Sequence, residues 1–172
     1  MIYYLLIILG IATRFLPHPA NFTAVGAAAI FSGYYVQDKK MAFIIPFVIM
    51  LFSDWFFGFY QPAIMFSVYI CFGLMVYSGI LIKSKKWLYS VSTSIIGAIA
   101  FFIITNYAVW QFGNWYPHTI SGLSTCFIVA IPFFKGTLFG NLFYTSVLFG
   151  TAEFAKYLAK RYFRFQNSAN KI

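Results

Sequence analysis

Residues 63–82 read AIMFSVYICFGLMVYSGILI, and residues 87–110 read WLYSVSTSIIGAIAFFIITNYAVW. Neither stretch contains a charged residue. A helix of about 20 apolar residues crosses the hydrocarbon layer of a bilayer, which is about 30 Å thick. Both stretches reach that length, so they predict two membrane-spanning helices and make the rest of the chain part of a membrane protein.

The composition agrees with this prediction. Of the 172 residues 62% are hydrophobic and only 9% are charged, whereas about 25% of residues are charged in soluble domains. The net charge of +9 does not indicate nucleic-acid binding, because the lysines and arginines occur in short clusters between apolar runs and form no basic helix. We therefore expect an all-α membrane protein with a single domain over residues 1–172, without a nucleic-acid partner.

Four further segments complete the expected architecture. Residues 41–59 are long enough to span, with Pro46 expected to kink the helix, while residues 2–16 and 23–36 are short for a full crossing. Residues 121–158 are too long for one crossing and contain Pro132 and Lys135, so we expect 121–134 to enter and leave the membrane on one side as a re-entrant segment. The predicted helices are about 2–16, 23–36, 41–59, 63–82, 87–110 and 136–158.

The basic clusters predict the orientation. Lysines and arginines concentrate in cytoplasmic loops, which places the turn at 37–40, the segment at 83–86 and the tail after residue 155 on the cytoplasmic side. Only a single crossing between residues 121 and 158 keeps the tail there. The sequence thus predicts a multi-pass protein of the bacterial inner membrane with both termini in the cytoplasm.

Most of the remaining polarity then falls in two outer loops. Residues 14–23 read RFLPHPANFT and residues 111–122 read QFGNWYPHTISG, and each contains a Pro-His pair. Non-helical backbone at membrane depth is tolerated where it is buried in protein or lines a water-filled cavity. The two loops therefore indicate the lining of an outward-facing cavity.

Arg14 and Asp54 are expected to pair at the outer ends of their helices. A charge inside a membrane costs about 2.5–3.5 kcal/mol on insertion scales, and such residues commonly mark partners or transport pathways. Two roles stay open for this pair, namely a tie that holds the first loop and direct contact with a ligand. Glu153 is expected to pair with Lys156 on one helix face.

Several uncharged polar residues join the candidate site. Asn106 and Asn141 lie in predicted helices and need hydrogen-bond partners, which could be a ligand or neighbouring backbone. Aromatic residues near Asn106 form either part of the site or an interfacial belt. Two histidines without a nearby carboxylate pair do not predict a metal site. The candidate ligand-binding residues are Arg14, His18, Asn21, Asp54, Asn106, Trp110, Tyr116, His118 and Asn141.

Small residues recur at four-residue spacing in Ala24–Ala28, Ala29–Gly33 and Gly136–Gly140. This spacing lets helices approach closely. Either packing within the chain or docking of another membrane protein would account for it.

Three stretches resemble an uncharacterised family of small bacterial integral membrane proteins with the pattern R-x-L-P-H-P-x-N-F-T. They are RFLPHPANFTAVGAAAIF from Arg14, SDWFFG from Ser53 and YPHTISGLSTC from Tyr116. The six-helix plan and the entry IPFFKG into the last helix also resemble the S-components of energy-coupling-factor (ECF) transporters. Those proteins bind vitamins or related micronutrients in an outward-facing pocket.

The resemblance implies a pocket beneath the first loop, closed by the loop between the fifth and sixth helices, and no cofactor of its own. It also implies partners, namely a transmembrane coupling subunit and ATPases. Ala24 and Ala28 match the spacing of an A-x-x-x-A motif that meets the coupling subunit. Some S-components for cobalamin use a cysteine as cobalt ligand, which makes Cys126 a candidate ligand and cobalamin a candidate cargo.

The sequence leaves three alternative functions open. Capture of a micronutrient is the leading hypothesis, because a cavity with few convergent polar groups is typical of small-molecule sites, and the absence of a P-loop sequence assigns any ATP-driven step to other chains. An assembly subunit would have a filled interior. An enzyme acting on a lipid would use Asp54, His18 and His118 as acids and bases.

Overall fold

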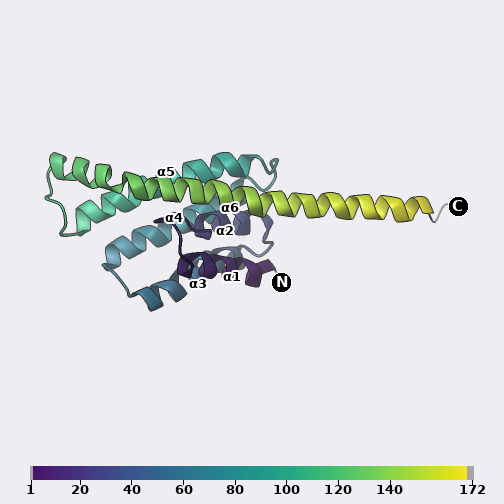
Figure 1. Ribbon diagram of the computed structural model, residues 1–172, viewed down its shortest axis with the longest axis horizontal. Helices are drawn as coiled ribbons and strands as arrows, with labels where there is room; N and C mark the ends of the chain where they lie inside the picture. The colour runs from purple at the N-terminus through teal and green to yellow at the C-terminus, as the bar shows by residue number, and fades with distance from the viewer. Residues whose placement is uncertain (1, 170–172) are drawn as a thin grey trace.

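The computed structural model describes residues 2–169, with side chains for residues 2–162. The described residues form six helices and their connecting loops, as predicted (Figure 1). Four helices, α3 to α6, are long and apolar enough to cross a membrane, and α1 is a shorter apolar helix. The helices are α1 (Ile2–Phe15), α2 (Val25–Tyr35), α3 (Lys39–Phe57), α4 (Pro62–Leu81), α5 (Tyr89–Phe112) and α6 (Ile120–Ala169).

Helix α2 forms the centre of the bundle. It is too short to span a bilayer, and every residue from Val25 to Gly33 is buried. Its small residues allow close contact with α4, because a Cβ atom on Gly33 would overlap the carbonyl of Val76 and one on Gly79 would overlap the carbonyl of Ile30. The small-residue spacing thus serves packing within the chain.

Larger side chains fill the space around α2. Ile30 and Phe31 on α2 pack with Ile45 and Ile49 from α3 and with Phe149 from α6 in one buried cluster. The rings of Phe31 and Phe149 meet edge to face, with centroids 5.1 Å apart. Since an apolar helix surface gains little from burial when lipid is the alternative, this interdigitation of shapes contributes most of the specificity of packing.

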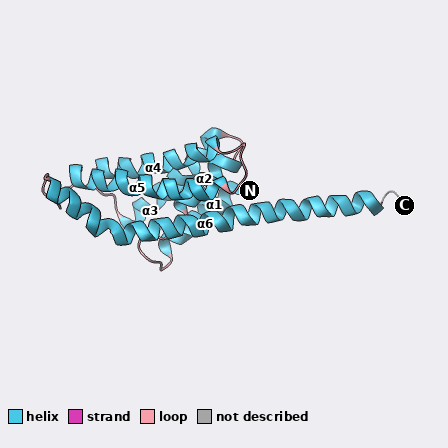
Figure 2. Ribbon diagram, turned by 90° about the horizontal axis from the view of Figure 1, so that it is seen from above, coloured by secondary structure: helices cyan, strands magenta, loops and turns pink. Residues whose placement is uncertain are grey.

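The expected re-entrant segment over 121–134 is not present. Residues 120–169 form one continuous helix, α6, that includes Pro132 and Lys135. Figure 2 shows that α6 bends along the bundle and then continues well beyond it toward the C-terminus. A proline in a membrane helix removes one backbone hydrogen bond and bends the helix without ending it, and the exposed Lys135 has a chain long enough to carry its ammonium away from apolar surroundings. As one helix, residues 120–162 are long and apolar enough to cross a membrane.

One end of the bundle gathers the basic loops, and we call it the basic end. The Tyr34 hydroxyl donates to the Lys85 carbonyl at 2.8 Å, and the Lys83 ammonium donates to the Val36 carbonyl at 3.2 Å. These bonds join the α2–α3 turn to the α4–α5 loop.

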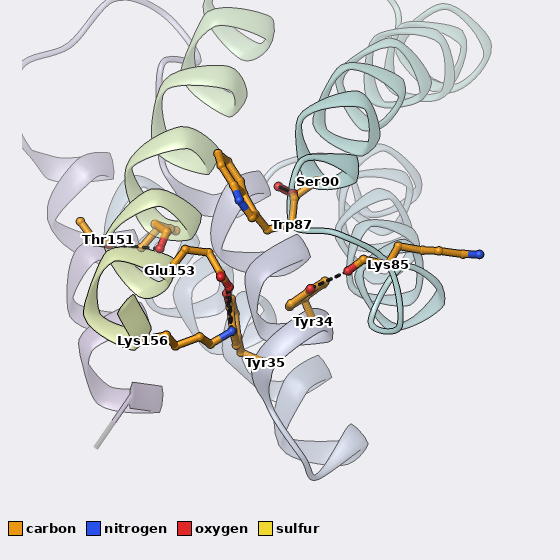
Figure 3. Close-up of polar contacts among 9 residues, drawn as sticks. Tyr34, Tyr35, Lys85, Trp87, Ser90, Thr151, Glu153 and Lys156 are labelled. Carbon is orange, nitrogen blue, oxygen red and sulfur yellow. Dashed lines mark hydrogen bonds and ion pairs between the residues drawn. The ribbon is translucent and has the colours of Figure 1, made fainter. Parts of the chain in front are cut away.

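Helix α6 is fixed to the same end by a second cluster. Figure 3 shows Tyr35 and Lys156 meeting at the Glu153 carboxylate; the Tyr35 hydroxyl and the Lys156 ammonium each lie 2.7 Å from Glu153 Oε1. The predicted Glu153–Lys156 pair is therefore confirmed, with Tyr35 as an additional partner. The opposite end of the bundle, which carries the loops 58–61 and 113–119, is called the cavity end; the loop 16–24 lies deeper, where Ala20 meets Gly136 of α6.

Candidate ligand-binding cavity

A cavity of about 420 Å³ opens among all six helices and the loop 16–24. Its volume lies within the range of about 300–1,000 Å³ that is usual for small-molecule sites. Most of its wall is apolar, and the polar groups come from helix ends and from α5 and α6. The lining residues are Arg14, His18, Asn21, Thr23, Gly26, Met50, Phe57, Tyr60, Ile64, Val68, Phe72, Met75, Phe101, Phe102, Thr105, Asn106, Val109, Ala130, Phe133, Phe134, Thr137 and Asn141.

The loop 16–24 is held over the cavity by backbone contacts. Asn21 adopts a left-handed conformation with φ of 61°, which asparagine tolerates better than most residues. The N–H of Ala24 donates to the Thr13 hydroxyl at 3.1 Å. On the α6 side, a Cβ atom on Gly136 would overlap the carbonyl of Ala20. The glycines at 136 and 140 thus accommodate this loop, which explains their spacing.

Arg14 and Asp54 form the predicted ion pair. Arg14 Nη2 lies 3.1 Å from Asp54 Oδ1, and the Asp54 side chain is only 2% exposed. The other carboxylate oxygen accepts a hydrogen bond from the Tyr69 hydroxyl at 3.1 Å. Arg14 lines the cavity and Asp54 does not, so Asp54 acts as a tie between α1, α3 and α4 and orients the arginine.

Asn141 lies in the cavity wall with an unused donor. The residue is 3% exposed, and its Nδ2 atom has no hydrogen-bond partner among the described residues. A buried polar group without a partner costs about 1–3 kcal/mol. This cost is recovered if a ligand or an ordered water supplies an acceptor.

Asn106 has neighbouring backbone as its hydrogen-bond partner. Its Nδ2 donates to the Phe102 carbonyl one turn earlier at 2.7 Å. It still lines the cavity. The Cys126 thiol contacts the Asn106 carbonyl at 3.5 Å and is buried outside the lining.

The second outer loop lies at the cavity end but outside the lining. Trp110 Nε1 donates to the Pro117 carbonyl at 3.0 Å, and the rings of Trp110 and His118 meet edge to face at 5.5 Å. Trp110, Tyr116 and His118 are therefore not brought to the cavity. Of the two Pro-His pairs, only the first reaches the cavity, through His18.

The docking role suggested for Ala24 and Ala28 is contradicted by burial. Both residues are 0% exposed, because α2 lies in the middle of the bundle, and a surface that meets another protein has to be exposed in the free chain.

The sequence did not indicate several important lining residues. Tyr60, in the α3–α4 loop, contributes a phenol; burial and the nearby charge of Asp54, opposed by Arg14, raise its pKa to about 12, so that it stays protonated and can donate a hydrogen bond. Phe101, Phe102 and Phe134 supply ring surfaces. The sequence contains many phenylalanines, but this abundance does not show which rings face the cavity and which face lipid.

The groups that the acid–base hypothesis requires are not gathered in the lining. Among the described residues no group of three or more histidine, cysteine or acidic side chains could hold a metal ion. Asp54 is occupied by Arg14 and Tyr69, while His18 Nδ1 donates to the Pro19 carbonyl at 2.7 Å. The proposed acid–base set of Asp54, His18 and His118 is not assembled around the cavity.

The chain belongs to a family of unknown function, DUF6580, whose model matches residues 1–164. No curated protein and no solved structure matches it.

Proposed function

We propose that this DUF6580 protein is a substrate-capture subunit of the S-component type, which binds a vitamin or related micronutrient in the cavity between its helices. The observation that carries this proposal is a cavity of about 420 Å³ that combines apolar walls with Asn141, a buried amide that lacks a partner. Such a combination is characteristic of sites that select small molecules. An assembly subunit would instead be expected to have a filled interior.

The proposal includes an orientation. The basic end would face the cytoplasm, in accord with the positive-inside rule, and the cavity end would face outward in the bacterial inner membrane. Both basic loops and the Glu153–Lys156 segment lie at the basic end, which supports this arrangement. The termini would then both be cytoplasmic.

Transport would require other chains. The cavity offers binding groups only, so a transmembrane coupling subunit and ATPases would supply the energy. Their contact surface would lie outside Ala24 and Ala28, which are buried. Cobalamin gains no support as cargo, because Cys126 lies outside the lining.

Mass spectrometry of the purified protein tests the proposal. The protein is extracted from its native membranes in mild detergent, and small molecules released on denaturation are quantified per chain. Capture predicts about one micronutrient-sized molecule per chain. An empty protein that holds a partner chain would favour assembly, and a chemically altered lipid would favour catalysis.

A matched pair of variants locates the bound molecule. Ala130 is buried and lines the cavity, whereas the adjacent Val129 is 51% exposed and lies outside the lining. Ala130→Trp should fill the cavity and reduce the retained molecule by about ten-fold or more, since the occupied volume is no longer free. Val129→Trp should retain it. Equal retention by both variants would show that the molecule binds elsewhere.

A further inference from the structure

We propose that the N-terminus of α2, together with Asn141 and Arg14, binds a carboxylate of the ligand, so that the cargo is a small carboxylic acid with an apolar, ring-containing body. This inference rests on the proposed capture function and specifies the chemistry of its substrate.

The first turn of α2 presents unused donors inside the protein. Helix α2 begins at Val25 after Ala24, which provides no side-chain cap. The first N–H groups of a helix have no carbonyl partner within it. No described residue accepts a hydrogen bond from the N–H groups of Val25, Gly26 or Ala27. Gly26 lines the cavity, so this helix end meets the space where a ligand would lie.

Asn141 provides an independent indication at the same place. Its side chain is packed against Gly26 so closely that a Cβ atom there would overlap the amide oxygen. Its Nδ2 atom is buried without a partner. Amide and helix end therefore converge on one region from α6 and α2, and both offer hydrogen-bond donors.

Arg14 contributes a third donor, and its positive charge is balanced by Asp54. Its Nη2 is engaged by Asp54, while its buried Nε has no partner among the described residues. No aspartate or glutamate belongs to the lining. The charge of Arg14 is balanced by Asp54, so the positive end of α2 and the absence of an acidic side chain from the lining are what favour an anion over a cation.

The rest of the wall selects the body of the ligand. Phe101, Phe102, Phe133 and Phe134 line the cavity together with Tyr60. Aromatic rings pack well against flat apolar groups. A planar or ring-containing molecule with a carboxylate at one end satisfies both parts of the site.

Three naphthalene probes with different head groups test the assignment. 1-Naphthaleneacetate, 1-naphthaleneacetamide and 2-(1-naphthyl)ethylamine share an apolar body and are respectively anionic, neutral and cationic. Calorimetric titration of the full-length protein, freed of retained ligand in detergent, gives their Kd values. We expect the acetate to bind about ten-fold or more tightly than the amide, since hydrogen bonds to charged groups are stronger than neutral ones, and the amine to bind most weakly.

Two asparagine variants assign the selectivity to its source. Asn141→Leu should lower the preference for acetate over amide by about five-fold or more. Asn114→Leu, at an exposed position outside the lining, should leave that preference within about two-fold. The head-group order in the unmodified protein tests the assignment even if Asn141→Leu does not fold.

Several results would overturn the assignment. They are equal or reversed affinities for acetate and amine, no binding of any probe, and a preference for acetate that Asn141→Leu leaves unchanged. The capture function fails separately, if the protein from native membranes retains no small molecule. A retained molecule without a carboxylate would leave capture intact and refute only this inference.

Discussion

The Arg14–Asp54 pair offers the clearest test of how the helices are held together at the cavity end. The Asp54 carboxylate accepts hydrogen bonds of 3.1 Å from both Arg14 and Tyr69 and so connects α1, α3 and α4. Asp54→Asn preserves the shape of the side chain, but it removes the charge and turns one acceptor into a donor that faces another donor. We therefore expect Asp54→Asn to destabilise the fold.

The magnitude follows from burial. Removing one partner of a buried ion pair costs about 3–5 kcal/mol because the other charge is left without compensation. The Arg14 side chain is 22% exposed, so solvent recovers part of this cost, and we expect a loss of about 2–3 kcal/mol in the free energy of unfolding. In a double-mutant cycle with Arg14→Gln, the two substitutions should couple by about 1–2 kcal/mol.

Unfolding in mixed micelles of mild detergent and SDS, followed by tryptophan fluorescence, measures these free energies. Asp38→Asn is the matched control, because Asp38 is an exposed N-cap of α3 that accepts from the Lys40 N–H, and asparagine caps equally well. That variant should change stability by no more than about 0.5 kcal/mol. If Asp54→Asn were as mild as Asp38→Asn, or if the cycle showed no coupling, the ion pair would not be a structural tie.

Two further predictions concern packing in the bundle. Gly33→Ala should destabilise by about 1–3 kcal/mol, because its Cβ atom would overlap the Val76 carbonyl and force α2 and α4 apart; Gly150→Ala, where nothing lies within 4 Å, should be neutral or slightly stabilising in the same SDS titration. Phe149→Ala should cost about 3–5 kcal/mol by leaving a void in the core, whereas Phe154→Ala, at a position 62% exposed, should cost less than about 1 kcal/mol, and equal losses would contradict the assigned core.

Apolar length and local charge predicted much of the architecture. Five helices begin and end close to the segments expected from hydropathy, because a change from apolar to polar residues marks a helix end wherever the chain leaves the apolar layer. The predicted Arg14–Asp54 and Glu153–Lys156 pairs are both present. Residues of opposite charge in a sparsely charged protein have few alternative partners, which explains these successes.

Helix α6 shows where this reasoning fails. Pro132 and Lys135 were interpreted as interruptions, and a length limit was applied to the whole stretch 121–158. A membrane helix, however, can contain a proline, and nothing limits its extension into water once it has crossed. Hydropathy therefore identifies the apolar part of a helix better than it predicts where that helix stops.

The same reasoning predicts part of the cavity lining. Arg14, His18, Asn21, Asn106 and Asn141 all line the cavity, since polar side chains in an apolar chain tend to be gathered away from lipid. His118 and Ala24 were assigned from a repeated dipeptide and a spacing motif. Neither pattern contains the position of a loop or helix end relative to the cavity, which the packing of the whole bundle decides.

An experimental density map of the protein purified from its native membranes, at a resolution that shows side chains, tests the central claim most directly. The account predicts a compact density within the cavity that contacts the Asn141 amide and the first turn of α2. A cavity closed by collapsed side chains, or filled by a lipid tail that continues into the bilayer, would contradict it.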